Sequence, residues 1–500
     1  MPLPPFLGLN HPFPLPKSLP TKNPNHLPKN KSPPTTVRTT NRKIVIMAQY
    51  PIAPKSRRSF LANVALVTGG LLTGIPASVL AEKTSHATKY PNFPTLDPAW
   101  KQTWDSAIKV LAGNVRKTPA YPNPVLFEGS TYQGIWQECG PQESLVYAGL
   151  RSYLPIDPGT PDALEICRNT HSSFIALQRP DGQLPASVKT TETGFGQIQM
   201  VVPIAATAWE LSQITKDQEF LETAYSACSQ WDAWLRRYRD TRKTGLVEGF
   251  CTYDTGHDNS PRWAGIPNRC PDADARKCPA IASMPRLCPD LSATVYGARV
   301  ALTSMANALG KKTEADRWSA DAENIRQLII EKLYSPEDAS FYDLDAQNKF
   351  VRVRSDVISR VLGEHVLQLS EAHDRAIFEA VWERQLHNPK AFWAPYPFPS
   401  IALDDPTFVR PIPRNSWGGA SQALTALRAP RWMPHYGKQA ELNDLMRQWC
   451  DAITKHGEFK QQIDPLSGDF TQPDPGGYSP AALVFMEFAS RLTKNGSRRK

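Results

Sequence analysis

Acidic residues are missing from one end of this chain, and a basic excess is missing from the rest. Residues 1–81 contain no Asp or Glu but hold ten Lys and Arg, while the whole chain carries a net charge of +9. Subtracting ten from +9 leaves −1 for residues 82–500. Because this body lacks a basic stripe that would neutralise phosphates, we expect it not to bind nucleic acid.

Long apolar runs are scarce as well, and residues 61–80 form the one stretch that approaches the length of a membrane span. Three Gly and one Pro make this stretch weakly apolar for a span of ~20 residues. It follows Arg57-Arg58, an arrangement typical of a twin-arginine signal, and ends on Val79-Leu80-Ala81, which suits signal peptidase. We therefore expect residues 47–81 to engage the twin-arginine translocase and to be cleaved after Ala81. The mature protein would be soluble, and periplasmic or secreted.

Residues 1–46 are rich in Pro, Lys, Asn and Thr and have little apolar surface to bury. Such a composition cannot offset the entropy lost on ordering, so it predicts a disordered extension. Because the arginine pair lies unusually far from Met1, we expect Met47 to be the true start of the protein.

Closely spaced Cys and His ligands are also absent, so we expect no metal site and no cofactor. Cys270, Cys278 and Cys288 lie in a Pro-rich stretch, and export permits disulfides. We expect a disulfide-stapled loop here, with Cys251 as the available partner for the odd cysteine.

Helical periodicity dominates from residue 95 onward. The expected helices begin near residues 98, 141, 160, 202, 217, 289, 312, 354, 370, 416, 437 and 478. Strand-like alternation predicts one hairpin around residues 341–353. No linker divides residues 95–492, so we expect one all-α domain, an (α/α)6 toroid of six helical hairpins. Twelve helices would also fit an α-solenoid, and the loops decide between the two.

The most informative loop contains Asp254–Trp263, with the sequence DTGHDNSPRW. It resembles the Glu-Ser-Gly-x-Asp-Asn-Ser-Pro-Arg-Trp segment of glycoside hydrolase family 63 and of mannosylglycerate-hydrolase-like enzymes, and more distantly that of trehalases. The resemblance implies that Asp258 is the general acid. A carboxyl in a turn bounded by Gly and Pro can project into a pocket, where burial raises its pKa and suits it to protonate a leaving oxygen.

Four further segments match the family in the same order along the chain. They are Phe174–Pro185, Asp290–Ala293, Asn415–Gly419, and Asp464–Gly468 with the following Gly477–Ser479. The resemblance spans about residues 98–492 and makes residues 264–289 a Cys-rich insertion.

An inverting glycosidase needs a second carboxylate as general base, ~6.5–9.5 Å from the acid. The family has a Glu at the position of Gln461, and an amide cannot accept a proton at neutral pH. Glu458 is our first candidate, because it would share a face with Gln461 if this segment were helical. Asp464 is the second, and a carbohydrate-binding pseudoenzyme without a base is the third.

Sugar-binding side chains are predicted from aromatic residues in loops and from polar neighbours of the motifs, since flat aromatic faces stack on sugars. The candidates are Trp136, Glu138, Asp254, Arg262, Trp263, Trp393, Arg414, Trp417 and Gln461.

We therefore predict an exported glycoside hydrolase that cleaves an α-linked glucoside or mannoside, in an oligosaccharide or small glycoside, with inversion. The α preference follows from the resemblance alone. The pseudoenzyme is the main alternative, motivated by Gln461. A uronate lyase on the same barrel is a further alternative, and the DNSPRW segment argues against it.

Overall fold

A computed structural model describes residues 98–155, 161–410, 417–473 and 475–497, so the expected leader and Arg414 lie outside the described residues. The described residues contain twelve α-helices: α1 (Lys101–Asn114), α2 (Gly140–Gly149), α3 (Ala163–Ala176), α4 (Ile204–Thr215), α5 (Gln218–Tyr238), α6 (Pro289–Ala308), α7 (Lys312–Leu333), α8 (Val357–Gly363), α9 (Ala372–Val381), α10 (Ala423–Trp432), α11 (Gln439–His456) and α12 (Ser479–Ser497). Eleven begin within three residues of the expected position. The exception, α10, begins at Ala423 instead of residue 416.

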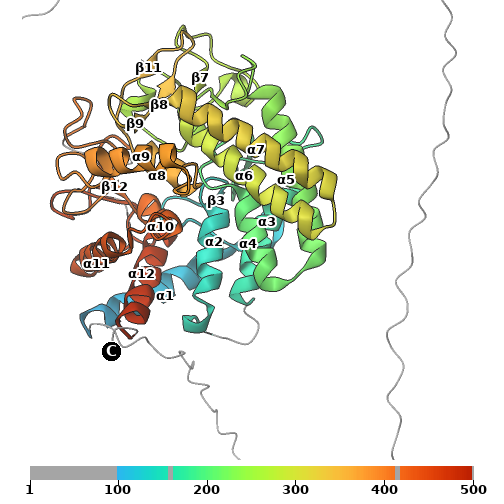
Figure 1. The fold of residues 1–500 in the computed structure, drawn as a ribbon. Coiled ribbons are helices and arrows are strands. Elements are labelled where there is room, and N and C mark those ends of the chain that lie inside the picture. The colour runs from blue at the N-terminus through green and yellow to red at the C-terminus, as the bar shows by residue number, and fades with distance from the viewer. Residues whose placement is uncertain (1–97, 156–160, 411–416, 474, 498–500) are drawn as a thin grey trace, which may run out of the picture. The chain divides into compact units, whose positions relative to one another are not determined.

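The even-numbered helices form an inner ring. Successive members α2, α4, α6, α8, α10 and α12 contact one another, and α12 contacts α2, which closes the ring. The odd-numbered helices α1, α3, α5, α7 and α11 pack against this ring from outside (Figure 1). This arrangement confirms the (α/α)6 toroid and rules out an open solenoid.

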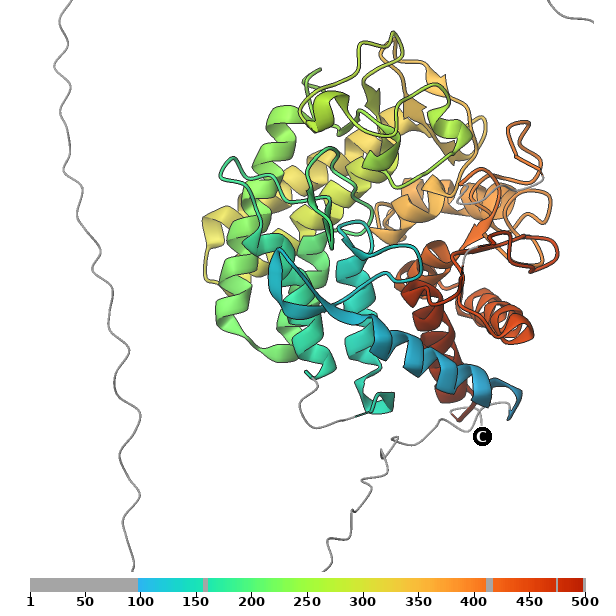
Figure 2. The same ribbon diagram turned by 180° about the vertical axis from the view of Figure 1, so that it is seen from behind.

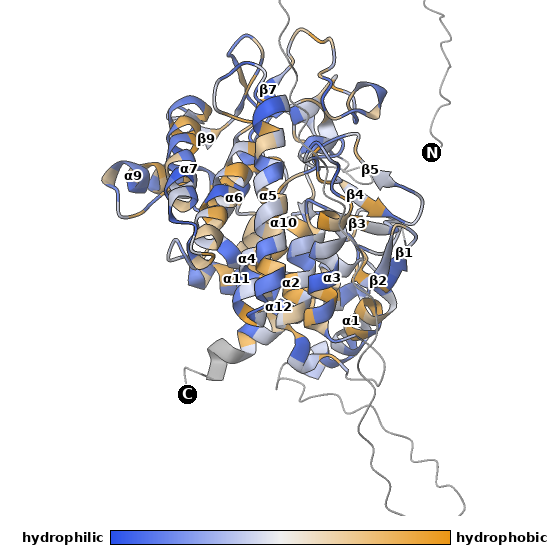
Figure 3. Ribbon diagram, turned by 90° about the vertical axis from the view of Figure 1, so that its right-hand side faces the viewer, coloured by the Kyte–Doolittle hydropathy of each residue, from blue (hydrophilic) through white to orange (hydrophobic). Residues whose placement is uncertain are grey.

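Burial follows this division into two layers. The inner helix α6 is buried along most of its length, whereas the outer helix α5 buries one stripe that includes Phe220, Leu221, Trp231 and Leu235. The ribbon of α5 accordingly alternates between hydrophilic and paler segments in Figure 3. An inner helix touches neighbours on several sides, so its sequence is less amphipathic than that of an outer helix.

The two ends of the domain meet. Helix α1 lies beside α12, as Figure 2 shows in blue and dark red. Trp100 packs edge-on against Phe485 with ring centroids 6.1 Å apart, and its Nε1 donates to Asp451 Oδ1 at 3.1 Å. The first and last parts of the domain therefore share one core. A separate finding is that the described residues include no helix with both the length and the apolar composition of a membrane span.

Short strands are more numerous than the one expected hairpin. They are β1 (Val115–Thr118), β2 (Tyr121–Leu126), β3 (Gly134–Trp136), β4 (Ser187–Lys189), β5 (Thr193–Gly194), β6 (Glu248–Gly249), β7 (Arg286–Leu287), β8 (Tyr334–Ser335), β9 (Ser340–Phe341), β10 (Asp343–Leu344), β11 (Phe350–Val351), β12 (Ser421–Gln422) and β13 (Gln462–Ile463). The expected hairpin is β10 and β11, with Leu344 opposite Phe350. Most of the others have two or three residues, too few to show alternation in sequence.

These strands tie together the loops that precede the inner helices. One sheet has the order β3-β4-β5, a second has the order β11-β10-β7-β6, and the pairs β1-β2, β8-β9 and β12-β13 stand alone. The three-stranded sheet precedes α2 and α4, the four-stranded sheet flanks the start of α6, and β12-β13 lies before α10 and α12. The loops at this end of the ring are therefore held by backbone hydrogen bonds, which suits a preformed pocket.

Candidate active site

The loops before the inner helices line a cavity of about 240 Å³. Among the predicted site residues, it contains Trp136 and Glu138 before α2, Asp258 before α6, Trp417 before α10 and Gln461 before α12. Its remaining lining residues are Glu128, Tyr132, Ser187, Lys189, Gln197, Gln199, Tyr253, Gly256 and Arg269. The structure thus brings together five side chains that are far apart in sequence.

A larger cavity, of about 640 Å³, lies among later parts of the inner helices. Gly149, Glu210, Arg431 and Arg491 are among its lining residues, and none of the predicted site residues lines it. We place the candidate active site in the smaller cavity, because it holds the carboxyl of the acid motif and lies before the helix N-termini, whose partial positive charge favours anions.

Asp258 is held in a tight turn. Gly256 has φ +62° and Asn259 has φ 55°, both in the left-handed region. The backbone N of Trp417 donates to the carbonyl oxygen of Asp258 at 2.9 Å, which ties the turn to the segment before α10. The Asp258 side chain is partly exposed and borders the cavity. The backbone therefore presents this carboxyl at the edge of the cavity.

Asp254 anchors this loop from behind. It is fully buried, and its Oδ1 accepts from Arg239 Nη2 at 3.0 Å and from the backbone N of Ile198 at 2.8 Å. Its Oδ2 accepts from the backbone N of Phe250 at 2.7 Å and of Cys251 at 3.2 Å. Asp254 was expected to bind substrate, but both of its oxygens are occupied and it does not line the cavity.

Arg262 and Trp263 are likewise buried behind the loop rather than beside a sugar. The Arg262 guanidinium donates to Asp290 at 2.7 Å through Nη1 and Nη2, and to Asp343 at 2.6 Å through Nη2 and 2.8 Å through Nε. Trp263 Nε1 donates to Thr255 Oγ1 at 2.9 Å. Neither side chain lines the cavity, so the prediction that they contact sugar directly is not supported. Both instead fix the loop that carries Asp258.

His257 lies under the turn as a neutral bridge. Its Nδ1 accepts from Arg262 Nη1 at 3.1 Å, and its Nε2 lies 2.9 Å from Asp356 Oδ1. Burial and the nearby Arg360 charge lower the pKa of His257 to about 4. The imidazole is therefore uncharged at neutral pH, and because Nδ1 accepts from Arg262, its one proton belongs on Nε2.

Glu138 borders the cavity on the side of the acid loop, which is the segment Asp254–Trp263 that carries Asp258. Burial raises its pKa, while the charges of Arg428 and Arg360 oppose this shift. Its Oε2 has no hydrogen-bond partner among the described residues. This oxygen is buried against Gly256, so Glu138 supports the turn that carries Asp258 while the residue lines the cavity.

Gly256→Ala is expected to lower kcat/KM by on the order of 10²-fold, because a displacement of about 1 Å in a catalytic site has that effect. A Cβ at Gly256 would stand 1.6 Å from Glu138 Oε2, and φ is +62° there. Steady-state kinetics measures the loss. Gly265→Ala is the matched control, since its φ is +75° but nothing lies within 4 Å of its Cβ. Equal losses in both variants would attribute the effect to backbone strain instead of to Glu138.

Gln461 occupies the wall beside Tyr132. Its Oε1 accepts from Tyr132 Oη at 2.8 Å and from Gln472 Nε2 at 3.0 Å. Tyr132 packs edge-on against Trp136 with centroids 5.6 Å apart. The amide at the family's base position is thus fixed in orientation and lines the cavity.

The structure does not bring Glu458 to this cavity. Helix α11 ends at His456, and Gly457 adopts φ 68°. The segment around Glu458 is therefore not helical, although the prediction of Glu458 as the base had required a helix there. The Glu458 side chain is 52% exposed and pairs with Lys460 at 2.9 Å. Asp464 also lies outside the cavity lining, paired with Arg410 at 2.7 Å. Neither alternative base borders the described pocket.

Trp393 is the remaining described candidate that does not line the cavity. It packs at 6.2 Å from Trp382 and 5.7 Å from Phe398, within the aromatic core near α10. Conversely, sequence reasoning missed Glu128, Tyr132 and Gln199, which do line the cavity. None of them belongs to one of the matched motifs, so only the fold identifies them.

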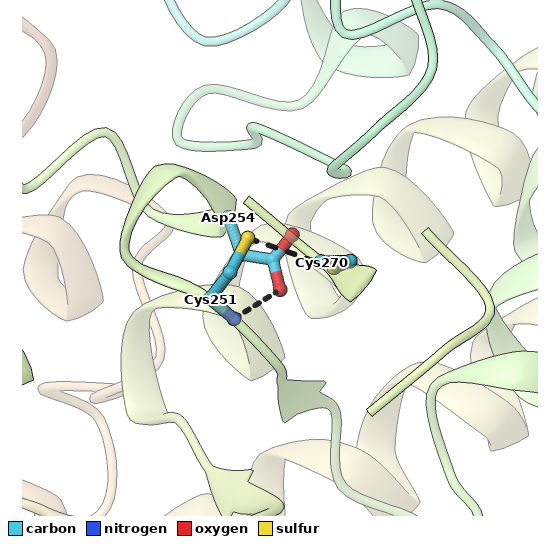
Figure 4. A group of neighbouring side chains, drawn as sticks. All are labelled: Cys251, Asp254 and Cys270. Carbon is cyan, nitrogen blue, oxygen red and sulfur yellow. Dashed lines mark hydrogen bonds between the residues drawn. The ribbon is translucent and has the colours of Figure 1, made fainter. Parts of the chain in front are cut away.

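Three thiols gather behind the acid loop. Cys251 Sγ lies 3.6 Å from Cys270 Sγ (Figure 4). Cys278 packs against the small cluster that these two residues form with Phe250. All eight cysteines are thiols in the structure, so the expected stapling within the insertion is not present. Cys251, Asp254 and Cys270 are close enough to share a metal ion, but Arg239 already occupies the carboxylate. The donor set therefore does not fit a cation.

Under oxidising conditions, we expect Cys251 and Cys270 to form a disulfide, because their sulfurs, 3.6 Å apart, need to approach by only about 1.5 Å. Glutathione disulfide is the oxidant, and it is reduced to two thiols as the bond forms. We expect ~2–4 kcal/mol of added stability. Peptide mapping without reductant identifies the pair, and Cys270→Ser is the control that should lose both the cross-link and the stabilisation. A cross-link between Cys270 and Cys278 would contradict the expected pairing.

The family model for the mannosylglycerate hydrolase MGH1-like glycoside hydrolase domain matches residues 166–480, more than half of the chain. The chain belongs to this glycoside hydrolase family. The matched range includes the acid loop, Trp417 and Gln461, and it confirms the resemblance inferred from the sequence motifs. The assignment supports a glycosidase and gives no support to the pseudoenzyme.

Solved structures show the same fold for this glycoside hydrolase. The GH63 mannosylglycerate hydrolase from Thermus thermophilus, in complex with Tris, is 18% identical with TM-score 0.59, and the match covers 78% of this chain and 100% of that one. The neutral trehalase Nth1 from Saccharomyces cerevisiae is 12% identical with TM-score 0.53, covering 74% and 75%. No curated protein matches the sequence.

Proposed function

We propose that this protein hydrolyses an α-linked glucoside or mannoside with inversion, and that Asp258 protonates the leaving oxygen. The observation that carries the proposal is the placement of Asp258 at the edge of a cavity that also contains Trp136, Trp417 and Glu138. A carboxyl, aromatic faces and polar groups that converge on one pocket are what a glycosidase needs.

The cavity offers two cations to an anionic group of a substrate, beside the carboxylates of Glu128, Glu138 and Asp258. Lys189 and Arg269 both line the cavity. A related structure is a mannosylglycerate hydrolase in complex with Tris and D-glycerate, at 18% identity. Mannosylglycerate therefore belongs among the first substrates to test, together with α-glucosides and α-mannosides.

The test is a panel of these glycosides with detection of released reducing sugar, followed by NMR of the first-formed anomer. Hydrolysis of an α-glycoside with initial release of the β-anomer is the expected result, because water attacks the face opposite the leaving group. Release of the α-anomer first would indicate a covalent intermediate and would overturn the two-carboxylate route. Sugar binding without turnover across the panel would overturn hydrolysis itself.

We also propose that the twin-arginine translocase exports the protein and that the mature form, periplasmic or secreted, begins at Glu82. The support is the order of Arg57-Arg58, the apolar stretch and Ala81. N-terminal sequencing of the protein from a producing bacterium tests the proposal. A chain that retains residues 47–81 and stays with the membrane would contradict cleavage.

A further inference from the structure

The family's base position is Gln461, yet the wall on which Gln461 lies contains a carboxylate of its own. Glu128 follows β2, is 4% exposed and lines the cavity. Its backbone N donates to Gly134 at 2.9 Å, and its carbonyl oxygen accepts from Ser479 N at 2.7 Å. The residue is therefore fixed between the segment before α2 and the start of α12.

Two tyrosines connect Glu128 with Gln461. Tyr478 Oη donates to Glu128 Oε1 at 2.6 Å, and Tyr132 Oη donates to Gln461 Oε1 at 2.8 Å. The two rings are neighbours, with centroids 5.8 Å apart. Glu128 and Gln461 thus belong to one wall of the cavity. Because only Oε1 of Glu128 accepts a hydrogen bond from the described residues, Oε2 is available to a water in the cavity.

The other carboxylates are placed differently. Glu138 lies against Gly256, on the same side as the turn that carries Asp258. Glu143 is buried behind the cavity and does not line it. A general base must hold water on the sugar face opposite the acid. Among the carboxylates that line the cavity, Glu128 is the one on the Gln461 wall rather than beside the acid loop.

We propose that Glu128 is the general base of this glycosidase, acting from the wall where Gln461 has replaced the family's Glu. The proposal rests on the hydrolytic function proposed above. The Glu128 carboxylate takes a proton from water as the water oxygen bonds to the anomeric carbon. Asp258 gives its proton to the leaving oxygen as the glycosidic C–O bond breaks. The products are the inverted sugar and the free alcohol, and solvent exchange resets both carboxyls.

The surroundings of Glu128 predict how its role depends on pH. Burial, followed by the nearby charges of Glu143, Glu138 and Asp258, raises the pKa of Glu128, and the Tyr478 hydrogen bond opposes this. A base must be ionised, so activity appears only as pH rises through this elevated pKa. The acid limb of the kcat/KM profile should therefore lie above the pH typical of an ordinary glutamate.

The decisive comparison uses the aryl α-glycoside that the wild type hydrolyses. Glu128→Gln should lower kcat at least ~10²-fold, whereas Glu458→Gln should remain within about twofold of wild type. Activity retained by Glu128→Gln, or lost only in Glu458→Gln, overturns the assignment while leaving the hydrolytic function intact. Inactivity of the wild type on the whole panel overturns both.

Two further measurements separate catalysis from folding. In Glu128→Ala, sodium azide should restore turnover of the α-glycosyl fluoride and give the β-glycosyl azide, because azide attacks without a base. Tyr478→Phe removes the hydrogen bond that stabilises the ionised carboxylate, so the acid limb should move to higher pH. The proposal is overturned if the acid limb of the pH profile does not move in Tyr478→Phe. It is also overturned if folded Glu128→Ala gives no glycosyl azide.

Discussion

Asp258→Asn is expected to lower kcat at least ~10²-fold on glycosides with poor leaving groups, because an amide cannot donate the proton that the departing oxygen needs. The loss should shrink on aryl glycosides with good leaving groups, which depart without full protonation. Asn preserves the shape of the side chain, and the turn is held by the backbone of Gly256 and by the bond from Trp417. Steady-state kinetics on alkyl and aryl glycosides measures both effects.

Asp272→Asn is the matched control for this prediction. Asp272 lies in the neighbouring insertion, its side chain is 75% exposed, and it pairs only with Lys277 among the described residues. The variant should keep wild-type kinetics on both classes of glycoside. If Asp258→Asn also hydrolysed the alkyl glycosides at the wild-type rate, Asp258 would have no role as the acid.

Arg262→Met is expected to lower the free energy of unfolding by ~3–5 kcal/mol, because it leaves buried carboxylates without their cation. Arg262, Asp290 and Asp343 are each no more than 3% exposed, and four hydrogen bonds of 2.6–2.8 Å join them. The charges of Arg262 and Arg360 hold the pKa of Asp290 below its usual range, although burial alone would raise this pKa. Both carboxylates therefore stay buried beside Met once the guanidinium is gone.

Urea denaturation measures the change in unfolding free energy, and Arg276→Met is the control. Arg276 pairs with Asp274 at 2.8 Å, but its side chain is 44% exposed. Exposed pairs contribute less than about 1 kcal/mol, so this control should unfold almost as the wild type does. A loss below about 1 kcal/mol in Arg262→Met would show that the carboxylates find other partners, and the loop would not depend on this cluster.

The sequence by itself was sufficient for the fold. Helical period and N-terminal signals placed eleven helix starts within three residues. The exception is α10, because the segment from Trp417 to Ala420 contains Gly418-Gly419, which disfavours a helix, and forms a turn before β12. There the backbone N of Trp417 bonds to Asp258, a tertiary contact that local propensity cannot anticipate.

The sequence also predicted Asp258 as a site residue, and the structure places it at the edge of the cavity. Sequence reasoning failed where a side chain's direction depends on a distant partner. Asp254 and Arg262 lie in the same loop as Asp258, yet both turn inward to Arg239, Asp290 and Asp343. A buried charge must be paired, and the partner's place is set only when the helices assemble.

Apart from Gln461, the wall of the cavity that carries Glu128 could be identified only from the tertiary structure. Glu128 and Tyr132 come from the segment after β2, Gln461 from the segment after α11, and Tyr478 from the start of α12. More than 300 residues separate Glu128 from Tyr478, whose hydroxyl holds it. No local pattern marks such a residue, because its role arises from closure of the ring, which places the first loop of the domain against its last helix.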